Sequence, residues 1–200
     1  MALYSIWVLG ESSISLTGGV TLDGVTQGDG SHLVGETLTI DMINSREINI
    51  DDSGSETNFA DNDSGQRLDG AQTIDGVPYA VISIIEAEYE FVVRDPDGNE
   101  YSLLAINVRN SSPAYATNEG LAFVGTPPPS GVPLEIISAS EGPPNSGPNA
   151  IDASEIVPLC FAQGTAIAVT SGDGPVEALR PGDMGRRVDR ALVAVCRVFQ

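Results

Sequence analysis

The sequence predicts an all-β protein whose N-terminal part forms a β-sandwich-like or multi-hairpin body. Two observations predict this fold class. Short runs rich in Val, Ile and Thr are separated by Gly, Asp and Asn through residues 1–140, which is typical of strands joined by turns. No run within residues 2–50 has the apolar spacing of a helix. The hydrophobic fraction of 41% in 200 residues suits one main folded core with an appendage.

The chain is strongly acidic. Its net charge is −19, with 28 acidic residues against 9 arginines and no lysine. We expect no nucleic-acid partner, because binding to phosphate needs clustered positive charge, and we expect cations to be favoured partners. No run of about 18 apolar residues predicts a membrane span. The first basic residue is Arg46, so we expect no Sec-type signal.

Residues 51–70 follow the first strands and are expected to form a long polar loop, with a domain sub-boundary near residues 45–58. Carboxylates and amides surround Phe59 in this loop. One interpretation is a calcium site with Asp51, Asp61 and Asp63 as ligands, because Ca²⁺ prefers oxygen ligands. The other interpretation, which the spacing alone favours, is a solvated loop with Asx turns. The loop lacks the EF-hand pattern.

Residues 77–108 contain the clearest predicted hairpin. Two β-rich runs flank Asp95-Pro-Asp-Gly-Asn, which is a strong turn sequence. A calcium loop is less favoured here, because Gly98 stands at the fourth loop position and Ile106 at the twelfth, where a glutamate is required. Strands are then expected at residues 121–124 and 134–137, completing a β-rich domain over residues 1–140.

The remaining residues change in character twice. Residues 141–158 are rich in Pro, Gly, Asn and Ser, which predicts a linker. Residues 184–200 form a basic tail with four of the nine arginines. Within this tail Val188, Ala191, Leu192, Val195 and Phe199 have an amphipathic helical spacing, so we expect a short C-terminal helix.

The stretch CFAQGTAIAVTSGDGPVEALRPGD covers residues 160–183. A lone cysteine is usually structural, but Cys160 here precedes a Gly-Thr turn, a short apolar strand, a Gly-rich hairpin around residues 172–174 and a Pro-Gly-Asp turn. This combination resembles the opening block of Hint domains, the autoprocessing module shared by inteins and hedgehog-type proteins. Upstream segments such as FADNDSGQRLDGAQTIDG and EGLAFVG are similar to the β-rich region of acidic, secreted bacterial Hint-domain proteins. The resemblance therefore covers residues 1–183.

The resemblance implies the first strands of an incomplete Hint β-fold in residues 159–183, with catalytic positions at Cys160 and Thr165 and a cleavage junction at Leu159. In this family the cysteine thiol attacks the carbonyl before it and converts an amide into a thioester, without a cofactor. Sulfur suits this step because the thiolate is a good nucleophile and leaves easily. The resemblance also implies an extracellular or cell-surface location. Secretion signals of such proteins often lie in a C-terminal part that this sequence does not contain, which argues against export of this form.

We expect the acyl shift to be inactive in this chain, which is identified as a truncated member of the class. The family's Thr-x-x-His block, whose histidine protonates the leaving nitrogen, does not follow Cys160, and the only histidine is His32. The resemblance stops at Met184, which suggests a shifted reading frame or a shortened gene. Cys160 and Cys196 could instead pair in an oxidising compartment. The alternative function is a non-catalytic extracellular or surface module for binding or structure, stabilised by calcium.

Overall fold

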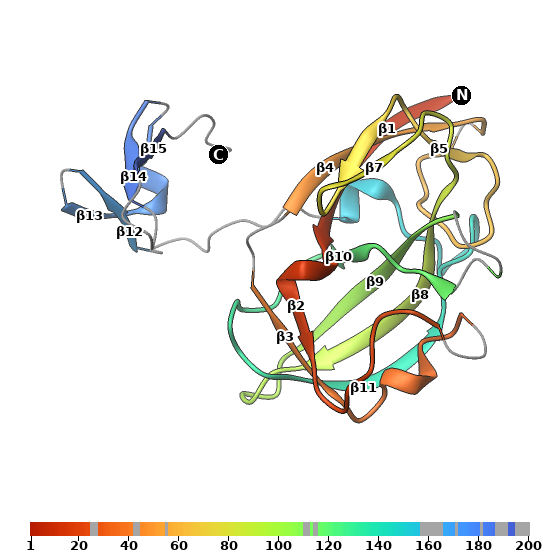
Figure 1. The fold of residues 1–200 in the computed structure, drawn as a ribbon, viewed down its shortest axis with the longest axis horizontal. Helices are drawn as coiled ribbons and strands as arrows, with labels where there is room; N and C mark the ends of the chain where they lie inside the picture. Colours follow the sequence, from red (N-terminus) through yellow and green to blue (C-terminus); the bar gives the residue numbers. More distant parts are fainter. Residues whose placement is uncertain are drawn as a thin grey trace. The chain divides into compact units, whose positions relative to one another are not determined.

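The computed structural model describes residues 1–24, 28–41, 45–54, 56–109, 113, 116–156, 166–170, 172–180, 182–186 and 192–194. The chain divides into two compact units, Met1–Leu159 and Cys160–Gln200, and each is described by itself. The described regular structure consists of antiparallel strands with a few single-turn 3₁₀ helices (Figure 1), which confirms the all-β prediction. No helix among the described residues has the length and apolar character needed to cross a membrane.

The first unit is built on one nine-stranded antiparallel sheet, in the order β2-β3-β11-β8-β9-β10-β1-β4-β5. Its strands are β1 (Ala2–Gly10), β2 (Ile14–Leu16), β3 (Thr37–Ile40), β4 (Ser45–Asp52), β5 (Gln66–Leu68), β8 (Ile85–Arg94), β9 (Glu100–Val108), β10 (Gly120–Val124) and β11 (Leu134–Glu141). A separate two-stranded ribbon joins β6 (Gln72–Ile74) and β7 (Val77–Tyr79). Single turns of 3₁₀ helix lie at Glu11–Ser13, Ser31–Leu33 and Ala153–Glu155.

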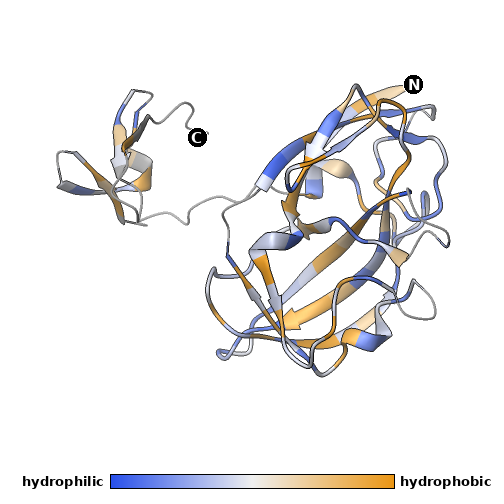
Figure 2. Ribbon diagram, viewed as in Figure 1, coloured by the Kyte–Doolittle hydropathy of each residue, from blue (hydrophilic) through white to orange (hydrophobic). Residues whose placement is uncertain are grey.

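Two apolar clusters fill the first unit, and Figure 2 shows hydrophobic residues along the central strands β8 and β9. The first cluster includes Leu104 and Ile106 of β9, whereas the second includes Leu103 and Ala105. Because successive side chains of a strand point to opposite faces, the clusters lie on opposite faces of the central strands. This arrangement explains why residues Leu103 to Val108 are all buried and lack the alternation of a half-exposed strand.

The predicted hairpin around Asp95 is confirmed as the β8–β9 connection. The Oδ1 atom of Asp95 accepts hydrogen bonds from the backbone N–H groups of Asp97 and Asn99, both at 2.9 Å. Its Oδ2 atom accepts from the Asn99 amide at 2.9 Å and from the Tyr101 hydroxyl at 3.0 Å. Both carboxylate oxygens are thus engaged in the turn, and these bonds lower the pKa of Asp95. The structure supports the turn interpretation over a calcium loop.

The linker expected at residues 141–158 is corrected for its second half. Ile151, Ala153 and Ile156 are buried in the first apolar cluster. The backbone N–H of Ala153 donates to the carbonyl of Thr57 at 2.8 Å. Composition predicted a linker because Pro and Gly dominate its first half, while the apolar residues after position 150 pack against the sheet. β4, which covers part of the expected sub-boundary near residues 45–58, pairs with β1 and belongs to the first unit.

The described part of the second unit is a four-stranded sheet in the order β13-β12-β14-β15. Its strands are β12 (Ala166–Val169), β13 (Gly172–Pro175), β14 (Met184–Arg186) and β15 (Leu192–Ala194), with a 3₁₀ turn at Val176–Ala178. The expected hairpin around residues 172–174 is confirmed by the β12–β13 pairing. In the predicted turn before β14, Asp183 accepts a hydrogen bond from the Arg180 N–H at 2.7 Å.

The expectation of a C-terminal helix is wrong for the described part of the tail. Met184–Arg186 and Leu192–Ala194 pair with each other as strands, and Gly185 also pairs with Val169 of β12. Short isolated helices are marginal in water, and valine-rich segments gain a hydrogen-bonded ladder by extending an existing sheet. Val188, Ala191, Val195 and Phe199, which carried part of the helical spacing, lie outside the described residues.

Candidate functional site

The residues assigned by the Hint resemblance lie outside the described part of the chain. These are Leu159, Cys160 and Thr165, and the same holds for Cys196. The three predicted calcium ligands are all described, but the structure does not bring them together as one site. Asp51 lies in β4, opposite Leu3 and Arg67. The Oδ1 atom of Asp63 accepts a hydrogen bond from the Gly65 N–H at 2.7 Å, as expected for an Asx turn.

The third predicted ligand, Asp61, lies in a cluster of carboxylates with Glu86 and Glu88. One carboxylate oxygen from each residue lies within 4.8 Å of the others. Glu86 is fully buried, Glu88 is 7% exposed and Asp61 is partly exposed. We call these three residues the acidic cluster. The sequence prediction did not include Glu86 and Glu88, because metal ligands are expected in polar loops and both of these acids lie in the buried strand β8.

A β-bulge in β8 shapes the acidic cluster. The pairing of β8 with β9 runs from Ala87 opposite Ile106 directly to Tyr89 opposite Ala105, so Glu88 is the extra residue. Ile85 and Ala87 belong to the first apolar cluster, whereas Tyr89 and Phe91 belong to the second. The bulge thus switches the side chains of β8 from one face to the other. Glu86 and Glu88 lie at this bulge, on either side of Ala87.

Two other segments hold Asp61 against this bulge. The N–H of Ala87 donates to the carbonyl of Ala60 at 3.1 Å, and the N–H of Asp61 donates to the carbonyl of Pro143 at 2.9 Å. The N–H of Gly142 donates to the carbonyl of Glu88 at 3.3 Å. A Cβ atom on Gly142 would lie 1.8 Å from the Ala87 oxygen, so only glycine allows this approach.

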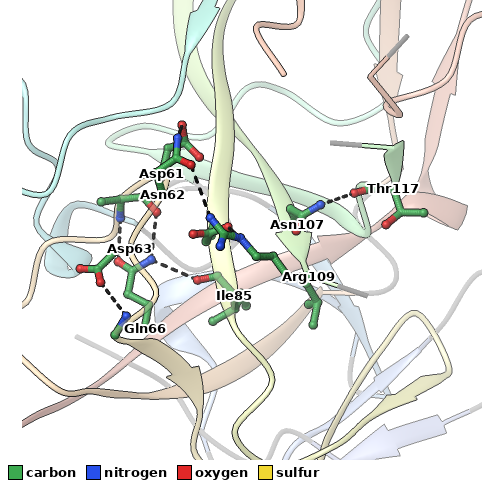
Figure 3. A network of polar contacts seen from close by, with 12 residues as sticks. Asp61, Asn62, Asp63, Gln66, Ile85, Asn107, Arg109 and Thr117 are labelled. Atoms are coloured by element: carbon green, nitrogen blue, oxygen red, sulfur yellow. Dashed lines mark hydrogen bonds and ion pairs between the residues drawn. The ribbon is translucent and has the colours of Figure 1, made fainter. Parts of the chain in front are cut away.

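Gln66 fixes the loop before Asp61 from inside the fold (Figure 3). Its side chain is fully buried. The Oε1 atom accepts from the Ala60 N–H at 2.8 Å, and Nε2 donates to the carbonyls of Ala60 at 2.9 Å and Ile85 at 3.0 Å. One side chain therefore links the Asp61 loop to the start of β8.

Arg109 is the cation at the acidic cluster. It follows β9, and its Nε atom donates to Oε2 of Glu86 in an ion pair. Its NH2 group lies 3.4 Å from Oδ1 of Asn62, as Figure 3 shows. The other oxygen of Glu86, Oε1, is buried and has no hydrogen-bond partner among the described residues. Arg109 therefore satisfies one half of the Glu86 carboxylate.

Burial and mutual repulsion favour the protonated forms of the cluster. The pKa of Glu88 is raised to about 7, mainly by burial and in addition by repulsion from Asp61, Glu86 and Glu141. Burial also raises the pKa of Asp61 to about 6. Burial raises the pKa of Glu86 as well, and Arg109 opposes that shift. With three carboxylates and one arginine, the arrangement can hold either protons or a further cation.

Comparison of the chain with models of known protein families, with curated proteins and with solved structures found no match.

Proposed function

We propose that the chain joins a β-rich body to the opening block of a Hint-type self-processing unit, with Cys160 as the nucleophile. The Cys160 thiolate attacks the carbonyl carbon of Leu159, and the bond from that carbon to the Cys160 nitrogen breaks. A thioester forms, and the freed nitrogen takes up a proton as the α-amine. A thiol is suited to this step at neutral pH.

The observation that carries this proposal is the position of the boundary between the two compact units. The chain divides into the units Met1–Leu159 and Cys160–Gln200, so the division falls in the same part of the chain as the junction that the sequence resemblance implies. A self-processing unit is expected to begin at the bond it cleaves, because the reacting cysteine belongs to the unit and the preceding residue belongs to the cargo. The β12–β13 hairpin and the turn at Asp183 also agree with the order of elements in the resembling block.

The 200-residue chain lacks the proton donor for this reaction, since no histidine follows Cys160. Loss of a general acid typically slows a reaction by about 10²–10⁴-fold. We therefore expect the purified chain to stay intact for hours in buffer. A shifted reading frame would also explain a change in the periodicity and charge of the sequence at residue 184, but β14 weakens the argument from periodicity, because Met184–Arg186 is a strand and not part of a helix. The change in charge at residue 184 still supports that hypothesis.

Chemical rescue tests the role of Cys160. The chain is incubated with hydroxylamine, which captures a thioester, with and without imidazole as a substitute proton donor, and is then weighed by mass spectrometry. Cleavage after Leu159 should increase with imidazole, disappear in Cys160→Ala and persist in the control Cys196→Ala. If no Cys160-dependent cleavage occurs with imidazole, Cys160 is not such a nucleophile.

A second candidate function is a non-catalytic extracellular or surface module, formed by the first unit alone. The observation that favours it is that both apolar clusters draw all their members from Ile6 to Ile156. The first unit therefore has an apolar core built from its own described residues. A fragment of residues 1–159 should melt cooperatively, within about 3 °C of the full chain. A fragment that is unfolded by circular dichroism would rule out an independent module.

A further inference from the structure

We propose that Asp61, Glu86 and Glu88 bind a hard divalent cation, and that calcium fits this site best. One carboxylate oxygen from each of the three side chains lies within 4.8 Å of the other two. Calcium binds oxygen at about 2.3–2.6 Å, so two ligands on opposite sides of one ion are separated by roughly twice that length. A single Ca²⁺ can therefore contact all three carboxylates with little movement of the chain.

The unsatisfied oxygen of Glu86 is a second, independent indication of a ligand. Glu86 is fully buried, and within the part of the chain that the structure describes its Oε1 atom has no hydrogen-bond partner, while Arg109 pairs with Oε2. A buried polar atom without a partner is unfavourable, and native structures rarely leave one. A cation in the acidic cluster would supply the missing partner, and the ion pair with Arg109 would hold the carboxylate in position for it.

The charge balance points the same way. Three carboxylates face one guanidinium, and Glu141 adds a further negative charge that acts on both Asp61 and Glu88. Like charges at this separation repel strongly where water is partly excluded. A divalent ion would remove the excess of the three carboxylates over Arg109. It would also reduce the repulsion from Glu141.

The chemistry of the donors selects the class of ion. All three ligands are carboxylates, and no cysteine or histidine belongs to the group among the described residues. Oxygen-only sites suit calcium and magnesium, whereas zinc and copper prefer nitrogen and sulfur ligands. Magnesium demands near-ideal octahedral geometry, but calcium accepts irregular geometry and bidentate carboxylates. A site assembled from a bulged strand and a loop is irregular, so calcium fits better.

The test measures calcium binding to the full 200-residue chain after treatment with chelator. Isothermal titration with CaCl₂ should give one Ca²⁺ per chain. At a Ca²⁺ concentration about 100-fold above Kd, the melting temperature should rise by about 5–10 °C over the chelated protein. Magnesium chloride at the same concentration should give a smaller rise. No binding heat together with an unchanged melting temperature in the wild-type chain would overturn the proposal.

Three variants locate the site. Glu86→Gln, Glu88→Gln and Asp61→Asn should each weaken Ca²⁺ binding by at least about tenfold. If Glu86→Gln fails to fold because Arg109 loses its partner, the other two variants decide the outcome. Glu90→Gln is the matched control on the same strand, since burial alone raises the pKa of Glu90. It should keep the full calcium response. If Glu88→Gln and Asp61→Asn both keep the wild-type calcium affinity and rise in melting temperature, calcium does not bind at the acidic cluster. This outcome is independent of the cleavage test at Cys160.

Discussion

Replacing Gly142 with alanine is expected to destabilise the first unit by about 4 kcal/mol. The added Cβ atom would lie 1.8 Å from the carbonyl oxygen of Ala87 and 2.7 Å from the Cβ atom of Asp61. Overpacking of this kind costs about 1–3 kcal/mol. The necessary shift also strains two hydrogen bonds, from Gly142 to Glu88 at 3.3 Å and from Asp61 to Pro143 at 2.9 Å, each contributing about 0.5–1.5 kcal/mol.

Thermal and urea melts followed by circular dichroism check this prediction on the full chain. For a unit of this size the melting temperature should fall by about 8–16 °C. Gly174→Ala is the control, because a Cβ atom there would meet nothing within 4 Å. If Gly142→Ala stays within about 0.5 kcal/mol of the wild-type chain, the segment at Gly142 does not approach the bulge this closely. The description of the acidic cluster would then be wrong.

Two further predictions concern neighbouring polar groups. In urea melts, Gln66→Leu should lower the free energy of unfolding by about 2–4 kcal/mol, because it leaves the buried Ala60 N–H without its partner. Gln72→Leu should cost less, since water can replace the two exposed hydrogen bonds between Gln72 and Asn49. The hydroxyl groups of Ser154 and Thr57 lower the pKa of Asp152. The ionised Asp152 carboxylate therefore contributes to folding stability above about pH 4, and this contribution is lost as pH falls through the lowered pKa. In melts from pH 5 to pH 2, the Asp152→Asn variant should lose less stability than the wild-type chain, by a difference of less than about 1 kcal/mol.

The strand content and local turns could be predicted from the sequence because they depend on neighbouring residues. The turn at Asp95 is the clearest example, since all of its hydrogen bonds come from residues within six positions. The order of strands in the sheet could not be predicted, because β1 pairs with both β4 and β10 across long separations in the sequence. Pairing between segments far apart in the chain leaves little pattern in the local sequence of either segment.

The acidic cluster was predictable only in part, for a related reason. Asp61 stood out because it lies in a polar loop, where carboxylates are expected to be accessible. Glu86 and Glu88 carried a signal in the run IIEAEYEF, where charged residues interrupt an apolar strand. Charged residues are rarely buried without a partner, so acids inside a predicted core strand are candidates for a site. The partner segment, however, comes from a distant loop and cannot be read from the strand itself.

The first unit has few basic residues to balance the charge of the acidic cluster. The first unit has only four arginines, Arg46, Arg67, Arg94 and Arg109. Arg109 pairs with Glu86, and no ion pair among the described residues involves Asp61 or Glu88. Self-repulsion destabilises so acidic a body, and a divalent ion bound at the acidic cluster would offset part of it. A site with three carboxylates, one of them partly exposed, is expected to have a Kd of about 10⁻⁴–10⁻³ M, as in extracellular calcium modules. Such a site would fill only at the millimolar calcium levels found outside cells, which agrees with the location implied by the resemblance. A Kd below about 1 μM in the calcium titration would contradict the expectation that the site fills only at the calcium levels found outside cells.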